Sequence, residues 1–226
     1  MIQAVIFDFD GLILDTESTL LAAWRRTYAE FGLELPLSPW VANIGGYSYE
    51  VFHPMDRLEQ LVGRTLDREA INQRRREWYW GQVRVQDVMP GVREAVDTAA
   101  GMGLKLGVAS SSDRKWVTGH LERLGLLDRF TALAFGDEAR RVKPDPELYR
   151  TVLDTLGVPA SRCFAIEDSP KGVAAAKGAG LYCVAVPNPV TETLDLGACD
   201  RRLASLDAVP FGRLVRDIEE TITRAL

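Results

Sequence analysis

Two aspartates, separated by one residue, come directly after an apolar run near the start of the chain. The run covers residues 4–7 (AVIF), and such branched and aromatic stretches are typical of a central parallel strand with both faces covered. Asp8 and Asp10 therefore leave the same side of the extended chain, at the strand end where open α/β sheets bind ligands. Two acids held close together require a cation or a positive side chain, so the pattern favours catalysis.

An acidic loop or a calcium-binding loop is the alternative interpretation of this Asp-x-Asp-Gly pattern. An EF-hand loop would need an oxygen ligand at position 12, a glycine at position 13 and a glutamate at position 19. The chain has Leu12, Ile13 and Thr19 at these positions. The pattern is therefore not that of a calcium loop.

Two further stretches carry polar groups that suit a phosphate. Ser110 and Ser111 follow a predicted strand and precede a helix, so hydroxyl and backbone N–H donors would face the same edge of the sheet. Plain helix capping is the alternative interpretation. Lys143 precedes Pro144, which restricts Lys143 to an extended backbone and thus to a stiff approach. An exposed lysine before a capped helix remains the alternative.

Adjacent carboxylates, Glu167 and Asp168, end another apolar run and precede a serine and a proline that predict a helix start. Together with Asp8 and Asp10, they would bring four acids from two strands to one edge of the sheet. Such a concentration of negative charge requires a cation. Oxygen ligands suit Mg²⁺, which keeps some of its water and shares its coordination sphere with substrate phosphate.

Strand and helix patterns alternate from residue 89 to the end of the chain. We expect strands at residues 4–7, 105–109, 132–135, 163–166 and 182–186 and near residue 203, with single helices between them. Such connections imply right-handed crossovers and a parallel sheet. The helix at residues 146–156 is expected to have Asp145 as its N-cap. Residues 16–88 show only helical stretches, broken by proline and glycine, which indicates a helical insertion.

Composition narrows the class of protein. The formal net charge of −5 and the isoelectric point near 5.2 argue against a nucleic-acid-binding protein, which usually has a basic excess. The three cysteines have no C-x-x-C spacing, so neither a disulfide framework nor a zinc site is expected. No apolar run approaches the length of a membrane helix, and the first strand leaves no room for a signal peptide. We expect a cytoplasmic protein that binds neither nucleic acid nor membrane.

The ordered set of motifs resembles the haloacid dehalogenase-like (HAD) hydrolase superfamily. The closest likeness is to the subfamily that contains beta-phosphoglucomutase and phosphoglycolate-type phosphatases. It extends over essentially the whole chain and rests on DFDG at 8–11, Ser110, KPDP at 143–146 and EDSPKGVAAAKGAG at 167–180. The resemblance implies an α/β fold. Its Rossmann-like parallel core would comprise residues 1–15 and 89–226, with an α-helical cap domain inserted at 16–88.

The resemblance also implies roles for the two aspartates of the first motif. Asp8 matches the nucleophile, which attacks phosphorus and forms an aspartyl-phosphate. Asp10 matches the acid/base, which protonates the leaving alcohol and then activates water. The physical logic agrees with this assignment, because a two-step covalent transfer needs a nucleophile and a separate proton shuttle.

Phosphate-binding and metal-binding residues follow from the same resemblance. Ser110 and Lys143 match the phosphate-binding pair, and Ser111 lies beside them. An anionic nucleophile can approach an anionic phosphate only if a lysine and a metal ion offset the charge. The residues that match the Mg²⁺ site are Asp8, Asp10 through its backbone carbonyl, Asp168 and the adjacent Glu167.

Three activities compete within this resemblance. The second aspartate, Asp10, favours phosphoryl transfer, because the true dehalogenases lack it. A phosphosugar mutase of the beta-phosphoglucomutase type is the alternative, but Leu20 stands where that mutase has a participating histidine. A non-catalytic scaffold is disfavoured because every motif residue is intact. Hydrolysis of a phosphomonoester is therefore the predicted reaction.

The cap is expected to select the substrate. Gly45 and Gly46 suit a loop that closes over the site, and Arg75 is a candidate for contacting a second anionic group. The expected partner is a small phosphorylated metabolite, with a sugar phosphate, a glycolate-like acid and a nucleotide all open. The expected assembly is a monomer or a weak homodimer.

Overall fold

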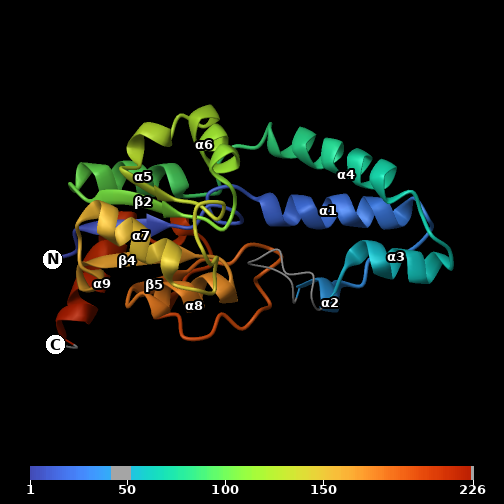
Figure 1. Cartoon of the computed structure of the whole chain (residues 1–226). Helices are drawn as coiled ribbons and strands as arrows, with labels where there is room; N and C mark the ends of the chain where they lie inside the picture. Colours follow the sequence, from blue (N-terminus) through green and yellow to red (C-terminus); the bar gives the residue numbers. More distant parts are fainter. Residues whose placement is uncertain (42–51, 225–226) are drawn as a thin grey trace.

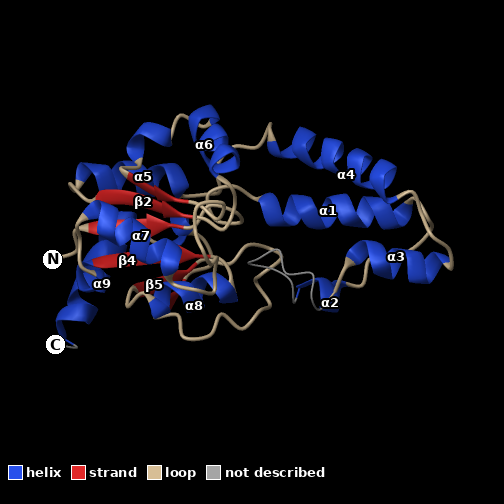
Figure 2. Ribbon diagram, viewed as in Figure 1, coloured by secondary structure: helices blue, strands red, loops and turns tan. Residues whose placement is uncertain are grey.

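The computed structural model describes residues 1–41 and 52–224, and within them six parallel strands form one sheet (Figure 2). Their order is β3-β2-β1-β4-β5-β6, so the first strand lies between β2 and β4. The strands are β1 (Ala4–Phe7), β2 (Lys105–Ala109), β3 (Ala132–Ala134), β4 (Cys163–Glu167), β5 (Tyr182–Ala185) and β6 (Arg201–Arg202). The predicted parallel α/β sheet is confirmed.

Register brings the ends of the central strands together. Phe7 pairs with Val108 of β2 and with Ile166 of β4, and all three strands run in the same direction. The carboxyl ends of these three strands therefore lie at one edge of the sheet. That edge is the carboxyl edge predicted to hold the polar side chains.

Alternation along β1 accounts for the two layers of helices. Val5 and Phe7 point into a core shared with α5, α6 and α9, whereas Ala4 and Ile6 point into a core shared with α7 and α8. Those helices are α5 (Val92–Gly101), α6 (Arg114–Arg123), α7 (Glu147–Leu156), α8 (Pro170–Gly178) and α9 (Phe211–Arg224). Short 3₁₀ turns cover Leu127–Arg129, Ala160–Arg162 and Leu206–Ala208. Because helices cover both faces of the sheet at β1, this strand is a rigid support for the charged groups at its carboxyl end.

Among the described residues, four helices extend to one side of the sheet, beyond its carboxyl edge (Figure 1). They are α1 (Thr16–Ala29), α2 (Leu37–Val41), α3 (Pro54–Val62) and α4 (Arg68–Val83), and we call them the cap helices. They have a core of their own, in which Trp24, Tyr28 and Met55 are buried. Asp15 begins α1, because its Oδ1 accepts a hydrogen bond from the Ser18 backbone N–H at 3.0 Å. Gly45 and Gly46 lie outside the described residues.

One helix start differs from the sequence prediction. The N-cap of α7 is Pro146, and the helix begins at Glu147. Asp145 instead accepts a hydrogen bond from the Glu147 backbone N–H at 3.0 Å, so its side chain stabilises a local turn just before the helix.

None of the described helices has the length and apolar character needed to cross a membrane.

Candidate active site

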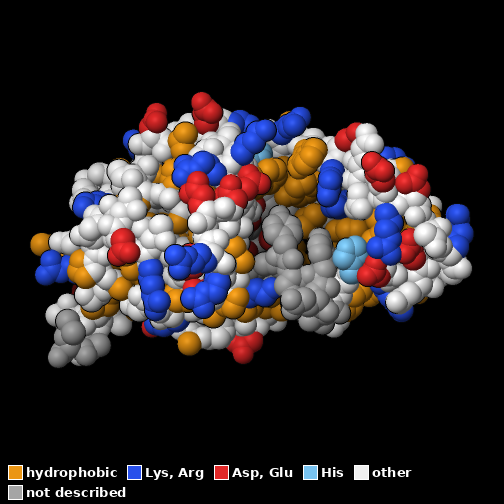
Figure 3. All heavy atoms as spheres, viewed as in Figure 1, with side chains coloured by type: hydrophobic (Ala, Val, Ile, Leu, Met, Phe, Trp, Pro, Cys, Tyr) orange, Lys and Arg blue, Asp and Glu red, His pale blue; other side chains and the backbone are white. Residues whose placement is uncertain are grey.

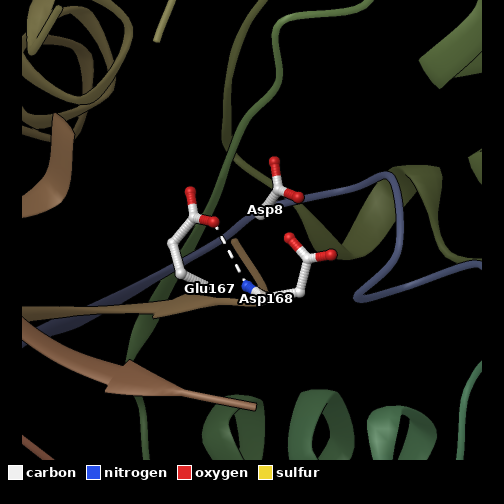
Figure 4. Close-up of side chains that lie close together, drawn as sticks. All are labelled: Asp8, Glu167 and Asp168. Carbon is white, nitrogen blue, oxygen red and sulfur yellow. Dashed lines mark hydrogen bonds between the residues drawn. The ribbon is translucent and has the colours of Figure 1, made fainter. Parts of the chain in front are cut away.

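Three buried carboxylates meet at the ends of β1 and β4 (Figure 4). Asp8 directly follows β1, Glu167 is the last residue of β4, and Asp168 comes next. One carboxylate oxygen from each residue lies within 4.8 Å of the other two. The sequence prediction that these acids converge from two strands holds for Asp8, Glu167 and Asp168, and their spacing could hold a metal ion.

Lys143 lies between two of these carboxylates. Its Nζ is 2.5 Å from Asp8 Oδ1 and 2.6 Å from Glu167 Oε1, and its side chain is only 4% exposed. Burial acts to lower the pKa of Lys143, but the Asp8 and Glu167 carboxylates outweigh this effect and raise the pKa above its ordinary value. The lysine is therefore a fixed positive charge, and not an exposed side chain before a helix.

One lysine does not neutralise three acids. Burial raises the pKa of Asp8, and burial followed by repulsion from Asp8 and Glu167 raises the pKa of Asp168 well above its ordinary value. Burial also raises the pKa of Glu167 to about 7, although Lys143 opposes the shift. The site therefore has surplus negative charge that a bound cation would relieve.

Neighbouring side chains fix the orientation of Glu167 and Asp168. Tyr149 donates its hydroxyl to Glu167 Oε1 at 2.5 Å, and the Asp168 backbone N–H donates to Glu167 Oε2 at 3.2 Å (Figure 4). Asn188 donates through Nδ2 to Asp168 Oδ2 at 2.7 Å and to the Gly11 carbonyl at 3.3 Å. Among the described residues, Glu167 thus accepts three hydrogen bonds from protein donors, two of them at Oε1, whereas Asp168 accepts one from Asn188 and lies beside Asp8.

Asp10 lies beside this cluster with a different set of partners. The Ser112 hydroxyl donates to Asp10 Oδ2 at 2.6 Å, and the Trp116 indole N–H donates to Asp10 Oδ1 at 3.0 Å. Gly11 follows with a φ of 82°, a conformation that favours glycine, and a Cβ there would overlap the Asp168 carboxylate. The chain can therefore turn sharply after Asp10 without moving the acids.

The hydroxyl groups after β2 approach the same edge. Ser110 is buried, and its Oγ accepts a hydrogen bond from the Ser112 backbone N–H at 3.0 Å. The Ser111 hydroxyl oxygen is also buried and has no hydrogen-bond partner in the part of the chain that the structure describes. Both serines therefore lie on a loop whose polar groups are not fully used by the fold.

The first turn of α1 adds a carboxyl group next to the two aspartates. Glu17 is half-buried, and burial together with the carboxylates of Asp10 and Asp8 raises its pKa to about 8. The hydroxyl of the preceding Thr16 is buried and has no partner among the described residues. These groups extend the polar edge of the sheet toward the cap helices.

A hollow separates the sheet from the cap helices, and apolar side chains gather on the α4 side of it (Figure 3). Arg75, the cap arginine selected from the sequence, lies on α4 with its guanidinium 4.3 Å from the centre of the Trp24 ring. It also donates to Asn72 Oδ1 at 3.3 Å. Leu20 of α1 is partly buried and packs against the cores on both sides.

Several residues of the site were missed by reasoning from the sequence. Asn188 follows the fifth strand, so the rule that polar residues at strand ends mark the site would have found it. Ser112 could have been found because it belongs to the serine stretch after the second strand. Glu17 could have been found because it follows the first aspartate motif closely. Trp116 and Tyr149 give no local signal, because an aromatic residue on a helix is usually a packing residue.

The parallel α/β sheet and the acids at its strand ends agree with the comparison with protein families. The family model described as "Haloacid dehalogenase-like hydrolase" matches residues 5–186 of the chain. The chain therefore belongs to this family, as the resemblance in its motifs implied, and it is an enzyme of the hydrolase class.

Relatives of the chain include two that are named as phosphatases. The "Putative phosphatase YhcW" of Bacillus subtilis is 45% identical over 95% of this chain and 97% of its own length. The "Phosphorylated carbohydrates phosphatase" of Thermotoga maritima is 32% identical over 79% of this chain and 82% of its own length. Among solved structures, CbbY from Rhodobacter sphaeroides in complex with phosphate has a TM-score of 0.69 and 27% identity, covering 91% and 95% of the two chains.

Proposed function

We propose that this hydrolase cleaves small phosphomonoesters, such as sugar phosphates or similar metabolites, through an aspartyl-phosphate on Asp8. The observation that carries the proposal is the ion pair between the buried Asp8 carboxylate and Lys143, beside a second carboxylate, Asp168, with which Asp8 could share a metal ion. A buried carboxylate whose charge is partly offset in this way can approach an anionic phosphate. The phosphatase relatives support the same class of substrate.

Asp8, Glu167 and Asp168 fit a divalent cation such as Mg²⁺. Their donor atoms are all oxygen, they are buried, and Lys143 is the single positive charge bonded to them among the described residues. Asp8 and Asp168 would hold the ion directly, with Glu167 beside them and the backbone carbonyl of Asp10 as a further ligand. The bound ion would supply positive charge to the phosphate oxygens.

The chain's own groups account for the bond changes. An Asp8 oxygen attacks phosphorus, the bond from phosphorus to the ester oxygen breaks, and protonated Asp10 gives its proton to the leaving alkoxide. Asp10 then takes a proton from water, whose oxygen attacks the same phosphorus and releases phosphate and free Asp8. Lys143, an ammonium with three donors of which two are used here, and the serines Ser110 and Ser111 would bind the phosphate oxygens.

Residues 1–15 and 89–226 form the catalytic core in this proposal, and residues 16–88 form the cap domain that selects the substrate. Arg75, Gly45 and Gly46 remain the proposed cap contacts. A mutase reaction is the less favoured alternative, because the aspartyl-phosphate would have to be kept from water and Leu20 offers no titratable group at the first cap helix.

Phosphate release from a panel of phosphomonoesters tests the proposal. Wild type should release phosphate only with Mg²⁺, and Asp8→Asn should lose activity by on the order of 10³-fold or more, as expected for a residue of a catalytic unit. Asp154→Asn makes the same chemical change at an exposed position of α7 and serves as the control. Full activity of Asp8→Asn would refute the proposal, and no release by folded wild type would favour the mutase.

A further inference from the structure

The acid/base candidate Asp10 is held by side chains of a single loop and helix. Ser112 binds one oxygen of its carboxylate at 2.6 Å, and Trp116, in the first turn of α6, binds the other at 3.0 Å. An indole has one donor and no acceptor, so the hydrogen bond to Asp10 uses the whole polar capacity of Trp116. Bonds to a carboxylate are stronger than bonds between neutral groups. Both carboxylate oxygens of Asp10 are thereby fixed in direction.

Trp116 also touches the cap. Its ring stacks on Tyr79 of α4, with ring centres 5.9 Å apart and an angle of 13° between the planes. His120 of the same helix meets the indole edge-to-face, with ring centres 4.4 Å apart and an interplanar angle of 72°. The indole therefore contacts one cap side chain and one core side chain, and both contacts limit the direction of its N–H.

A second contact ties α6 to the end of α4. Arg123, at the last residue of α6, donates through Nη1 to the Gln86 carbonyl at 2.8 Å. Gln86 follows α4 in the chain and donates through Nε2 to Thr19 Oγ1 of α1 at 2.6 Å. The two ends of α6 thus contact the cap at separate points, and Trp116 is the point that also reaches Asp10.

We propose that Trp116 is a positioning residue that sets the orientation of Asp10 according to the placement of cap helix α4. This inference rests on the proposed role of Asp10 as acid/base. A displacement of α4 moves Tyr79, the stacked indole turns with it, and the N–H no longer points at Asp10 Oδ1. The carboxylate then loses one of its two fixed bonds, and proton transfer becomes slower although the nucleophile and the phosphate-binding groups are unchanged.

Trp116→Phe tests the hydrogen bond, because phenylalanine keeps an aromatic face for Tyr79 and removes the N–H. With a hexose 6-phosphate and Mg²⁺, kcat should fall roughly ten- to a hundredfold, the range expected for one hydrogen bond to a charged group, with KM unchanged. The rapid first release of p-nitrophenol from p-nitrophenyl phosphate should keep its rate, because this leaving group needs no proton. Trp80→Phe makes the same change at an exposed position of α4 and should behave as wild type.

Tyr79→Leu tests the link to the cap without altering Trp116. It should lower kcat for the alkyl ester selectively, whereas Tyr79→Phe, which keeps the ring, should retain it. These variants also decide the case if Trp116→Phe does not fold, as checked by urea unfolding.

Three results would overturn the inference. They are wild-type or faster turnover by Trp116→Phe, equal loss of the p-nitrophenol burst and of alkyl-ester turnover, and identical behaviour of Tyr79→Leu and Tyr79→Phe. Asp10→Asn, measured in parallel, distinguishes a failure of the acid/base role of Asp10 from a failure of the positioning role of Trp116. Full turnover by Asp10→Asn means that the acid/base assignment fails, whereas an inactive Asp10→Asn with an unaffected Trp116→Phe means that only the role of Trp116 fails.

Discussion

Gly172, in the first turn of α8, lies so close to the Glu167 carboxyl group that a side chain cannot be added there without a shift. A Cβ at this position would overlap both carboxylate oxygens and the carbon between them. Glu167 is fully buried and bonds Lys143 and Tyr149, so its carboxyl group has no room to move away without breaking those bonds. Gly172→Ala therefore perturbs the charged cluster from behind, without removing any charged group.

The size of the effect follows from two opposing contributions. Breaking a buried ion pair costs about 3–5 kcal/mol, whereas alanine stabilises a helix relative to glycine by up to about 1 kcal/mol. The free energy of unfolding of Gly172→Ala should therefore fall by about 2–4 kcal/mol. Phosphatase activity should fall as well, because Lys143 loses the partner that holds it against Asp8.

Urea unfolding followed by tryptophan fluorescence measures this change, with two matched controls. At Gly178, in the same helix, the atoms nearest to an added Cβ would be those of Pro146, at 3.4 Å or more, and at Gly119 of α6 a Cβ would meet nothing within 4 Å. Alanine at either position should be neutral or stabilising. If Gly172→Ala were as stable as these controls, the inference that a Cβ at this position displaces the Glu167 carboxyl group would be refuted.

Further predictions concern metal binding and pH. Mg²⁺ at a hundred times its dissociation constant should raise the unfolding free energy of wild type by about 2.7 kcal/mol and leave Asp168→Asn unchanged; an equal rise in both would contradict the metal site. Without Mg²⁺, Asp168→Asn should be at least as stable as wild type, because the cost of burying the Asp168 charge and its repulsion from Asp8 and Glu167 disappear. Burial, with a smaller effect of Arg123, lowers the pKa of His120 from 6.5 to about 4, so the unfolded chain takes up this proton at higher pH than the folded chain. The free energy of unfolding of wild type should therefore fall relative to that of His120→Gln as pH falls from about 6.5 to 4, by up to about 3 kcal/mol at pH 4. If the unfolding free energies of the two proteins changed with pH in parallel, this prediction would be contradicted.

Much of the fold could be predicted because its signals are local. An unbroken apolar run such as residues 4–7 is nearly always a buried strand, and single helices between such runs allow few topologies. The convergence of Asp8, Glu167 and Asp168 then follows from parallel strands ending at one edge. Lys143 could be included because the proline after it limits its backbone. Its bonds to both Asp8 and Glu167 depend on how the loop after β3 folds, and no local pattern carries that information.

The parts that could not be predicted depend on contacts between distant segments. The bond from Trp116 to Asp10 joins residues 106 positions apart, and the stack with Tyr79 depends on where the cap helices lie. A tryptophan in the first turn of a helix has no property that separates this role from ordinary packing. The first residue of α7 also could not be predicted from the sequence, because both Asp145 and Pro146 are suited to a helix terminus. Only the tertiary structure selects between them.

Chemical trapping of the phosphorylated enzyme tests the central claim most directly. Wild type would be mixed with a phosphomonoester and Mg²⁺, quenched in acid within the first turnover, and treated with borohydride, which reduces an acyl phosphate to an alcohol. Mass spectrometry of the peptide that contains residues 4–17 should then find homoserine in place of Asp8, and Asp10 unchanged. Homoserine at another acid, or a phosphate-releasing enzyme in which Asp8 is never reduced, would contradict the assignment of Asp8 as the nucleophile.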